Sequence, residues 1–184
     1  MTASLTRALG LWVAGQVDGL TVVADDLANR DRRYPVGTLT EIARELKPLG
    51  CGRKDFATRA PETGYVDQAG RLHLEDTRFR VTVSAPSDRE RAGQEIVDGV
   101  LAALERAVLT ATLEGEPLVL TDSEAEPLET FELDSLRTVG RVPVPVDITS
   151  EPFVYRGALS LRVTRTVPVA APVEAVIERI HVEG

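Results

Sequence analysis

The chain has 184 residues, with 29 acidic and 21 basic side chains and a formal net charge of −8. This length suits one domain with a hydrophobic core of its own. A single cysteine excludes an internal disulfide and a cysteine-rich zinc site, and two histidines offer little for another metal centre, so we expect no metal and no cofactor. The acidic balance disfavours a reader of duplex DNA, and no apolar run is long enough to cross a bilayer.

Two short elements are expected near the N-terminus. Residues 4–17 place apolar side chains at helical spacing, and Ser4 is suited to cap the start, which predicts a short amphipathic helix. The apolar run 20–24 predicts a strand. Segment 36–47 fits both periods: its local signals, including a capping-box pattern, favour a helix slightly, whereas its alternate residues also form one face of a strand.

The next stretch combines turn signals with one clear strand. Proline and glycine recur through residues 48–64, which predicts irregular structure there. A turn-like stretch at 67–70 between two short strand-like segments predicts a hairpin. Residues 78–84 then alternate between arginine or hydroxyl side chains and apolar ones, which predicts a half-buried strand.

The strongest expected element is an amphipathic helix over 87–109. Ser87 and Glu90 form a capping-box pattern at its start. Gly93 and Gly99 lower its intrinsic helix propensity, so its stability must come from packing on a sheet. Its apolar stripe consists of Ile96, Val97, Val100, Leu101, Leu104, Ala107 and Val108.

Acidic residues concentrate after this helix. Eight acids and no base lie between Arg106 and Arg137; without them the chain has 21 acids against 21 bases. We expect an acidic loop insertion over 112–136, with a possible short strand at 118–121. It lacks the central glycine of an EF-hand calcium loop, which favours a solvated surface over a metal site. The candidate acidic-surface residues are Glu124, Glu126, Glu129 and Glu132.

Two extended segments are expected near the C-terminus. Residues 141–150 read as a proline-containing arm or edge strand, because Pro143 and Pro145 remove alternate backbone donors. Residues 153–167 read as a long two-faced strand, antiparallel to a neighbour. The tail 173–182 is apolar enough to form a last strand or an arm on another subunit.

Together these patterns predict a single α+β domain over 1–184, with one mostly antiparallel sheet and two helices packed on it. The first helix is N-terminal, and the second is long and amphipathic. The side chains give no support for an enzyme, because the chain has no nucleophile-elbow, phosphate-loop or HExxH motif. Cys51, His73 and His181 stand alone, so we expect an incidental thiol and two surface or edge histidines.

The order of elements resembles that of the neck and tail-completion proteins of tailed bacteriophages, particularly tail terminators. The resemblance includes the N-terminal helix, the loop ending in Tyr34-Pro35, and the strand Arg78-Phe79-Arg80-Val81-Thr82-Val83-Ser84-Ala85. That strand runs into the main helix through Ala85-Pro86-Ser87-Asp88-Arg89-Glu90. A later strand begins with Gly157-Ala158-Leu159-Ser160-Leu161-Arg162-Val163. The resemblance favours a strand for 36–47.

The resemblance implies a non-enzymatic homo-oligomeric ring, commonly a hexamer, in the neck or tail of a virion assembled in the host cytoplasm. One surface would cap the tail tube protein and another would meet the head–tail connector, with DNA passing through and not specifically bound. The acidic segment would line the lumen or lie on the outside. The candidate interface residues are Val142, Val144, Val146, Tyr155, Arg156 and Arg162.

Two other functions remain open from sequence. One is a tube-cap, sheath-cap or baseplate subunit of a contractile phage tail or injection system, which would form filaments more readily than closed rings. The other is a soluble bacterial ligand-binding or enzymatic domain, which would show a concave pocket with convergent polar groups.

Overall fold

The computed structural model describes residues 4–24, 34–48, 54–60, 64–87, 91–113, 117–123, 125–144 and 153–170. Its elements in chain order are α1 (Leu5–Gly15), β1 (Thr21–Ala24), β2 (Val36–Pro48), β3 (Lys54–Ala60), β4 (Gly64–Pro86), α2 (Gly93–Leu113), β5 (Leu118–Asp122), β6 (Glu129–Leu133), β7 (Ser135–Val142) and β8 (Val154–Ala170).

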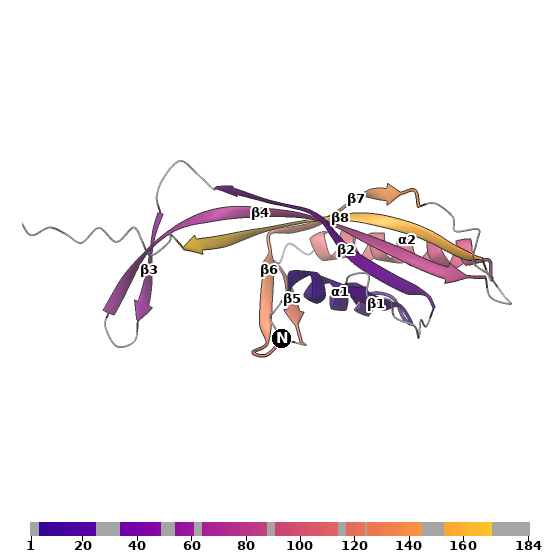
Figure 1. Ribbon diagram of the computed structural model, residues 1–184, viewed down its shortest axis with the longest axis horizontal. Coiled ribbons are helices and arrows are strands. Elements are labelled where there is room, and N and C mark those ends of the chain that lie inside the picture. Colours follow the sequence, from indigo (N-terminus) through magenta and orange to yellow (C-terminus); the bar gives the residue numbers. More distant parts are fainter. Residues whose placement is uncertain are drawn as a thin grey trace, which may run out of the picture.

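One large sheet organises the chain. Its strand order is β1-β2-β4-β8-β7, with β3 paired to the far end of β4. Only the β1–β2 pair is parallel among these described pairings; the others are antiparallel. Both helices, and the separate β5–β6 hairpin, lie on one side of this sheet (Figure 1). The predicted α+β class, with a mostly antiparallel sheet and helices packed on it, is confirmed.

Strand β4 shows why the sheet has two different faces. Buried side chains alternate with exposed or half-buried ones from Arg78 to Val83, so Phe79, Val81 and Val83 point toward the helices and are fully buried. The intervening Arg78 and Arg80 are exposed on the other face. The partner strand repeats this pattern, because the β4–β8 register sets Phe79 opposite Leu161 and Val81 opposite Leu159. The apolar set forms one core with α1, α2 and the hairpin.

Segment 36–47 is strand β2, so the strand that the resemblance favours is confirmed and the slight helix preference of the local signals is wrong. Its helical stripe is not a core face: Leu39 is fully buried, but Ile42 and Leu46 are 50% and 53% exposed. Pairing with β4 along the whole of β2 supplies backbone hydrogen bonds that local helix signals do not anticipate.

The irregular structure predicted for 48–64 is wrong at 54–60, and the hairpin turn predicted at 67–70 is also wrong; residues 49–53 and 61–63 lie outside the described residues. Strand β3 occupies Lys54–Ala60 and pairs with the beginning of β4, so the chain reverses between residues 60 and 64. Residues 67–70, predicted as the turn, continue β4 and pair with residues 54–57. The long-range pairing overrides the local turn preference of an Asp-Gln-Ala-Gly sequence.

The main helix is confirmed with shifted ends, at Gly93–Leu113 in place of 87–109. The Ser87 hydroxyl accepts a hydrogen bond from the Gly93 N–H at 3.0 Å, so it does not cap a helix beginning at residue 88. A Cβ on Gly93 would lie 2.6 Å from the Tyr155 ring and 2.8 Å from the Ala85 carbonyl oxygen. Glycine therefore lets the helix begin directly against the sheet. Its buried stripe contains Val97, Val100, Leu101, Leu104 and Val108, as predicted.

The acidic stretch 112–136 is not a loop insertion. Most of it forms the end of α2 and the β5–β6 hairpin, which joins the hydrophobic core. The buried side chains of this hairpin and the residues beside it are Leu120, Ala125, Phe131, Leu133 and Leu136. The apolar residues between the acids therefore alternate as they do in a strand, and a prediction based on the number of charges overlooks this alternation.

The segments predicted near the C-terminus have different outcomes. The two-faced strand over 153–167 is confirmed as β8, which is antiparallel to both β4 and β7. Strand β7 is last in the sheet order, but it includes only Arg141 and Val142 of the predicted arm or edge strand and ends before Pro143. The rest of the predicted arm beyond residue 144, the tail 173–182, Cys51 and His181 lie outside the described residues.

Candidate functional site

The face of the sheet turned away from the helices carries a row of arginines. Arg78 on β4 is directly opposite Arg162 on β8, and Arg162 is directly opposite Arg137 on β7. Arg80 lies one row further along β4, beside Ser160. The basic residues at positions of this face, here called the arginine face, are Lys47, Arg78, Arg80, Arg137, Arg156 and Arg162.

Only some of these cations are neutralised within the chain. Arg162 donates to Asp76 through Nε at 2.8 Å and again through Nη2, which lowers the pKa of the Asp76 carboxyl. Lys47 lies 2.8 Å from the Glu45 carboxylate. Within the described part of the chain, Arg80 and Arg137 have no hydrogen bond or ion pair. Among the described residues of this face, the three acids Glu45, Asp76 and, at its border, Asp134 are outnumbered by the five cations Lys47, Arg78, Arg80, Arg137 and Arg162.

This row is not explained by the stability of the fold. Directly opposed side chains on neighbouring strands lie about 5 Å apart at Cβ, and like charges in that position destabilise a sheet. A guanidinium stays charged at any physiological pH and offers five N–H donors in a planar fork that fits a carboxylate or phosphate. The arginine face is therefore suited to an anionic partner.

The β5–β6 hairpin presents the opposite charge. Glu126, Glu129 and Glu132 are exposed on it and near its turn, while its other side packs into the core. Asp122 anchors it: this fully buried carboxylate accepts from the Ser4 N–H at 2.9 Å and from Arg7 Nε at 2.7 Å. The exposed glutamates, here called the acidic hairpin, are thus displayed from a fixed element.

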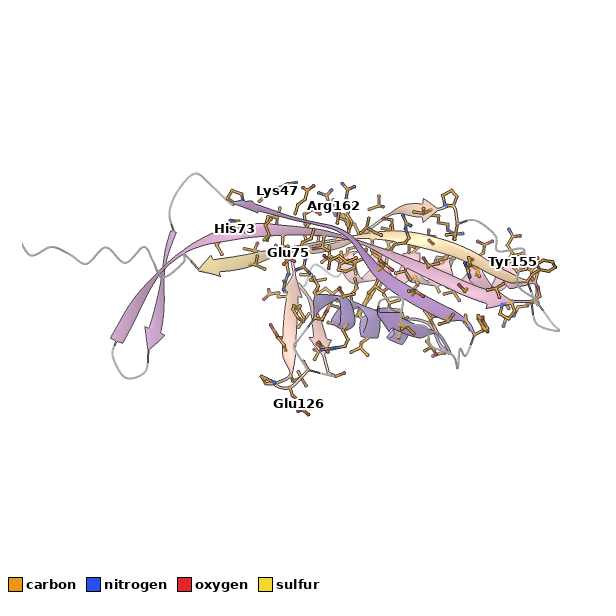
Figure 2. The ribbon with its side chains drawn as sticks, viewed as in Figure 1. Lys47, His73, Glu75, Glu126, Tyr155 and Arg162 are labelled. Atoms are coloured by element: carbon orange, nitrogen blue, oxygen red, sulfur yellow. The ribbon has the colours of Figure 1, made fainter. Side chains whose placement is uncertain are left out.

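These two surfaces lie on opposite sides of the molecule. In Figure 2, Arg162 and Lys47 are at the upper side of the sheet, and Glu126 is at the lower tip of the hairpin, beyond the helices. The core separates Glu126 from Arg162 and Lys47, so these charges cannot pair within one chain.

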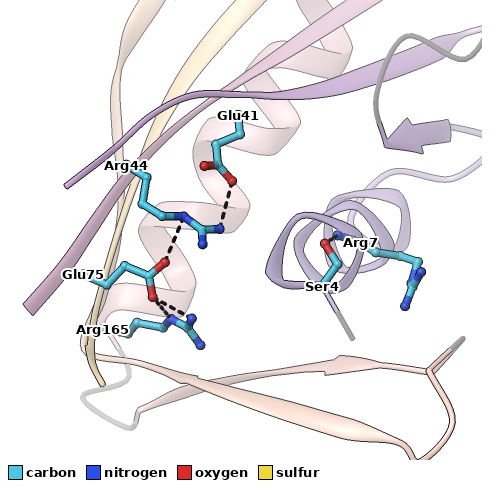
Figure 3. A network of polar contacts seen from close by, with 6 residues as sticks. All are labelled: Ser4, Arg7, Glu41, Arg44, Glu75 and Arg165. Carbon is cyan, nitrogen blue, oxygen red and sulfur yellow. Dashed lines mark hydrogen bonds and ion pairs between the residues drawn. The ribbon is translucent and has the colours of Figure 1, made fainter. Parts of the chain in front are cut away.

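A third charged cluster is centred on one buried carboxylate on the helix side of the sheet (Figure 3). Glu75 is 3% exposed and accepts from Arg165 Nε at 2.6 Å. Its other oxygen lies 3.1 Å from Arg44 Nε, an ion pair without hydrogen-bond geometry, and Arg44 extends to Glu41 at 3.0 Å. The Arg165 guanidinium stacks 5.2 Å from the centre of the Phe131 ring. This cluster joins the sheet to the hairpin and is a structural feature.

The structure separates the predicted interface residues. Arg156 and Arg162 share the arginine face, but Tyr155 points the other way and packs half-buried against the core beside Gly93. Val142 and Val144 are half-buried at and just beyond the end of β7, and Val146 lies outside the described residues. Among the acidic candidates, Glu126, Glu129 and Glu132 are all exposed on or near the hairpin, with Glu129 and Glu132 on opposite faces of β6, and Glu124 lies outside the described residues.

Sequence reasoning missed Arg78, Arg80 and Arg137 as surface candidates. The alternation of 78–84 does place Arg78 and Arg80 on one face. Their alignment with Arg137 depends on the β8 register between them, and nothing local to either strand specifies that register.

Two adjoining open grooves, of about 420 and 520 Å³, lie beside β5 and the second half of α2. Several of their polar groups are already engaged: Asp134 accepts from Thr166 at 2.8 Å, and Ser135 shares a 2.7 Å hydrogen bond with Thr164. Among the described residues no group of three or more His, Cys, Asp or Glu side chains is placed to hold a metal ion. The grooves therefore offer few convergent polar groups to a small ligand.

No protein-family model and no curated protein matches this chain. Within the described residues, no helix combines the length and apolar character needed to cross a bilayer.

Proposed function

We propose that this protein is a non-enzymatic structural subunit of the neck or tail of a tailed bacteriophage, assembling into a closed ring as tail terminators do. The observation that carries the proposal is the one-sided architecture. Both helices cover one face of the sheet, while no described element covers the other face or the edge of β7, and that face carries a cationic surface on a chain of net charge −8. An open charged face and an open edge are surfaces on which a neighbouring subunit can pack.

Such a subunit works through geometry alone. Each copy presents two different surfaces, and rotation about a common axis closes the contacts into a ring. The ring, of which six copies is the expected number, would cap the tail tube protein on one side and meet the head–tail connector on the other. DNA would pass through the ring without specific binding, and the assembled ring would reside in the virion neck or tail.

One alternative uses the same surfaces. If the rotation between neighbours does not close, the same head-to-tail contacts give an open helical filament, as expected of a tube-cap, sheath-cap or baseplate subunit. A soluble ligand-binding domain is disfavoured, because Asp134 and Ser135 in the groove beside β5 are already hydrogen-bonded to Thr166 and Thr164, which leaves few polar groups beside Arg137 to hold a small ligand.

The purified full chain tests this proposal. We expect mass photometry and negative-stain microscopy at low salt to show one closed ring of defined copy number. Filaments would favour the alternative. A protein that stays monomeric at all salt and protein concentrations, and also with tail tube protein, would overturn both assembly proposals.

A further inference from the structure

We propose that the acidic hairpin of one copy docks on the arginine face of the next copy, so that each subunit is joined to its neighbour by carboxylate–guanidinium pairs. This inference rests on the proposed function, since it names the contact that would hold the assembly together. Its occupant is a second copy of this chain.

Charge complementarity is the first argument. Arg80 and Arg137 have no hydrogen bond or ion pair within the described part of the chain. On the acidic hairpin, Glu126 and Glu132 are exposed, and no base occurs between Arg106 and Arg137 to neutralise them locally. Each surface therefore holds the groups that the other lacks.

The placement of the two surfaces is the second argument. Since the arginine face and the acidic hairpin lie on opposite sides of the core, one copy cannot satisfy both within itself (Figure 2). A contact between unlike surfaces is heterologous, and repeating it head to tail generates a ring or a filament. The arrangement thus provides one donor surface and one acceptor surface per subunit.

Rigidity is the third argument. The hairpin is tied to α1 through Asp122 and Arg7, and Phe131 is buried beneath Arg165. The opposing arginines are spaced by the ladders of three paired strands. Because both surfaces are held by the fold, docking loses little conformational entropy, and paired carboxylates can meet guanidinium forks bidentately.

Nucleic acid is the competing occupant of a cationic face. The whole chain carries −8, so a duplex would be repelled by the molecule while attracted by this one face. The carboxylates of a second copy are subject to the same overall repulsion, but they are carried on a hairpin that the Asp122–Arg7 contact already fixes. With the hairpin docked, its glutamates would lie between subunits and not along the lumen.

Two reciprocal charge reversals test the contact. The first variant is Arg80→Glu with Arg137→Glu, which leaves Arg162 and Arg78 near Asp76 untouched. The second is Glu126→Arg with Glu132→Arg; Glu129 is retained because it is directly opposite the anchor Asp122. A third chain carries all four changes and keeps the net charge of −8. Arg106→Glu, on the exposed surface of α2, is the control for a single charge reversal elsewhere.

Each reversed variant alone should require at least about tenfold more protein to assemble than the wild type, as measured by mass photometry. Mixing the two variants should restore the oligomer, because each reversed surface then meets its complement. The four-change chain should also assemble, and Arg106→Glu should match the wild type. Circular dichroism establishes that every variant folds.

The results separate this inference from the function that it rests on. A wild type that forms rings while both reversed variants also form them would overturn the contact and leave the ring proposal standing. Reversed variants that fail to assemble even when mixed would likewise overturn the pairing. Loss of binding to a short fluorescent duplex in the Arg80→Glu/Arg137→Glu variant, with ring formation intact, would assign the arginine face to DNA instead.

Discussion

The two faces of the main sheet differ in how completely their charged side chains are paired. On the helix side, the buried Glu75 is held between Arg165 and Arg44. On the other side, Arg78, Arg162 and Arg137 stand in one cross-strand row with one close carboxylate, Asp76, among them. Burying an uncompensated charge is far more costly than exposing one, so the fold must complete its pairs only where water is excluded. The exposed face is consequently the one left available to a partner.

The sharpest test of this contrast is to remove the buried carboxylate. Glu75→Ala should lower the free energy of unfolding by about 3 kcal/mol, because it leaves Arg165 without its counter-ion in a largely buried position. Chemical denaturation monitored by circular dichroism measures the change. Glu45→Ala, which removes an exposed acid paired with Lys47, is the control and should change stability by less than about 1 kcal/mol. Equal losses in the two variants would contradict the contrast between the faces.

The hairpin anchor should give the next largest effect. Asp122→Asn retains the size of the side chain but removes the charge that Arg7 and the Ser4 N–H contact, so we expect a loss of about 1.5–3 kcal/mol. Thr121→Ala, at the exposed neighbouring position on β5, is the matched control. Hydrogen exchange should report faster opening of β5 and β6 in Asp122→Asn. If the loss were confined to the end of α1, the carboxylate would not anchor the hairpin.

Asp76 allows the open face to be tested through pH. Its hydrogen bonds with Arg162 lower the folded-state pKa below the ordinary 3.8, so the ion pair stabilises the fold above about pH 4. That contribution is lost as pH falls through the lowered pKa. The stability difference between wild type and Asp76→Asn should therefore shrink in acid, as followed by thermal unfolding from pH 6 to pH 2. Neither arginine nor glutamine titrates in this range. The stability difference between the wild type and Arg80→Gln should therefore be independent of pH.

These contrasts were only partly accessible from sequence. Amphipathic periodicity is a local property, so the buried stripe of α2 and the strand that includes Phe79 could be predicted. Pairing is not local: β3 and the beginning of β4 contain turn-forming residues and become strands because they pair with each other. The arginine row is of the same kind, since Arg78, Arg162 and Arg137 belong to three strands far apart in the chain. In the acidic stretch, the many glutamates favoured the prediction of a solvated loop. Leu120, Phe131 and Leu133 nevertheless pack the hairpin against the core.

The smallest expected effect on folding concerns the exposed glutamates themselves. Glu126→Gln with Glu132→Gln removes two charges from a surface that is solvated in the free subunit, so the free energy of unfolding should change by less than about 0.5 kcal/mol. The same variant should assemble less readily, because docking on the arginine face uses these carboxylates. Thermal unfolding and mass photometry of one preparation measure both quantities. A large loss of stability would mean that the glutamates support the hairpin and do not serve a neighbour, and unchanged stability with unchanged assembly would remove them from the interface.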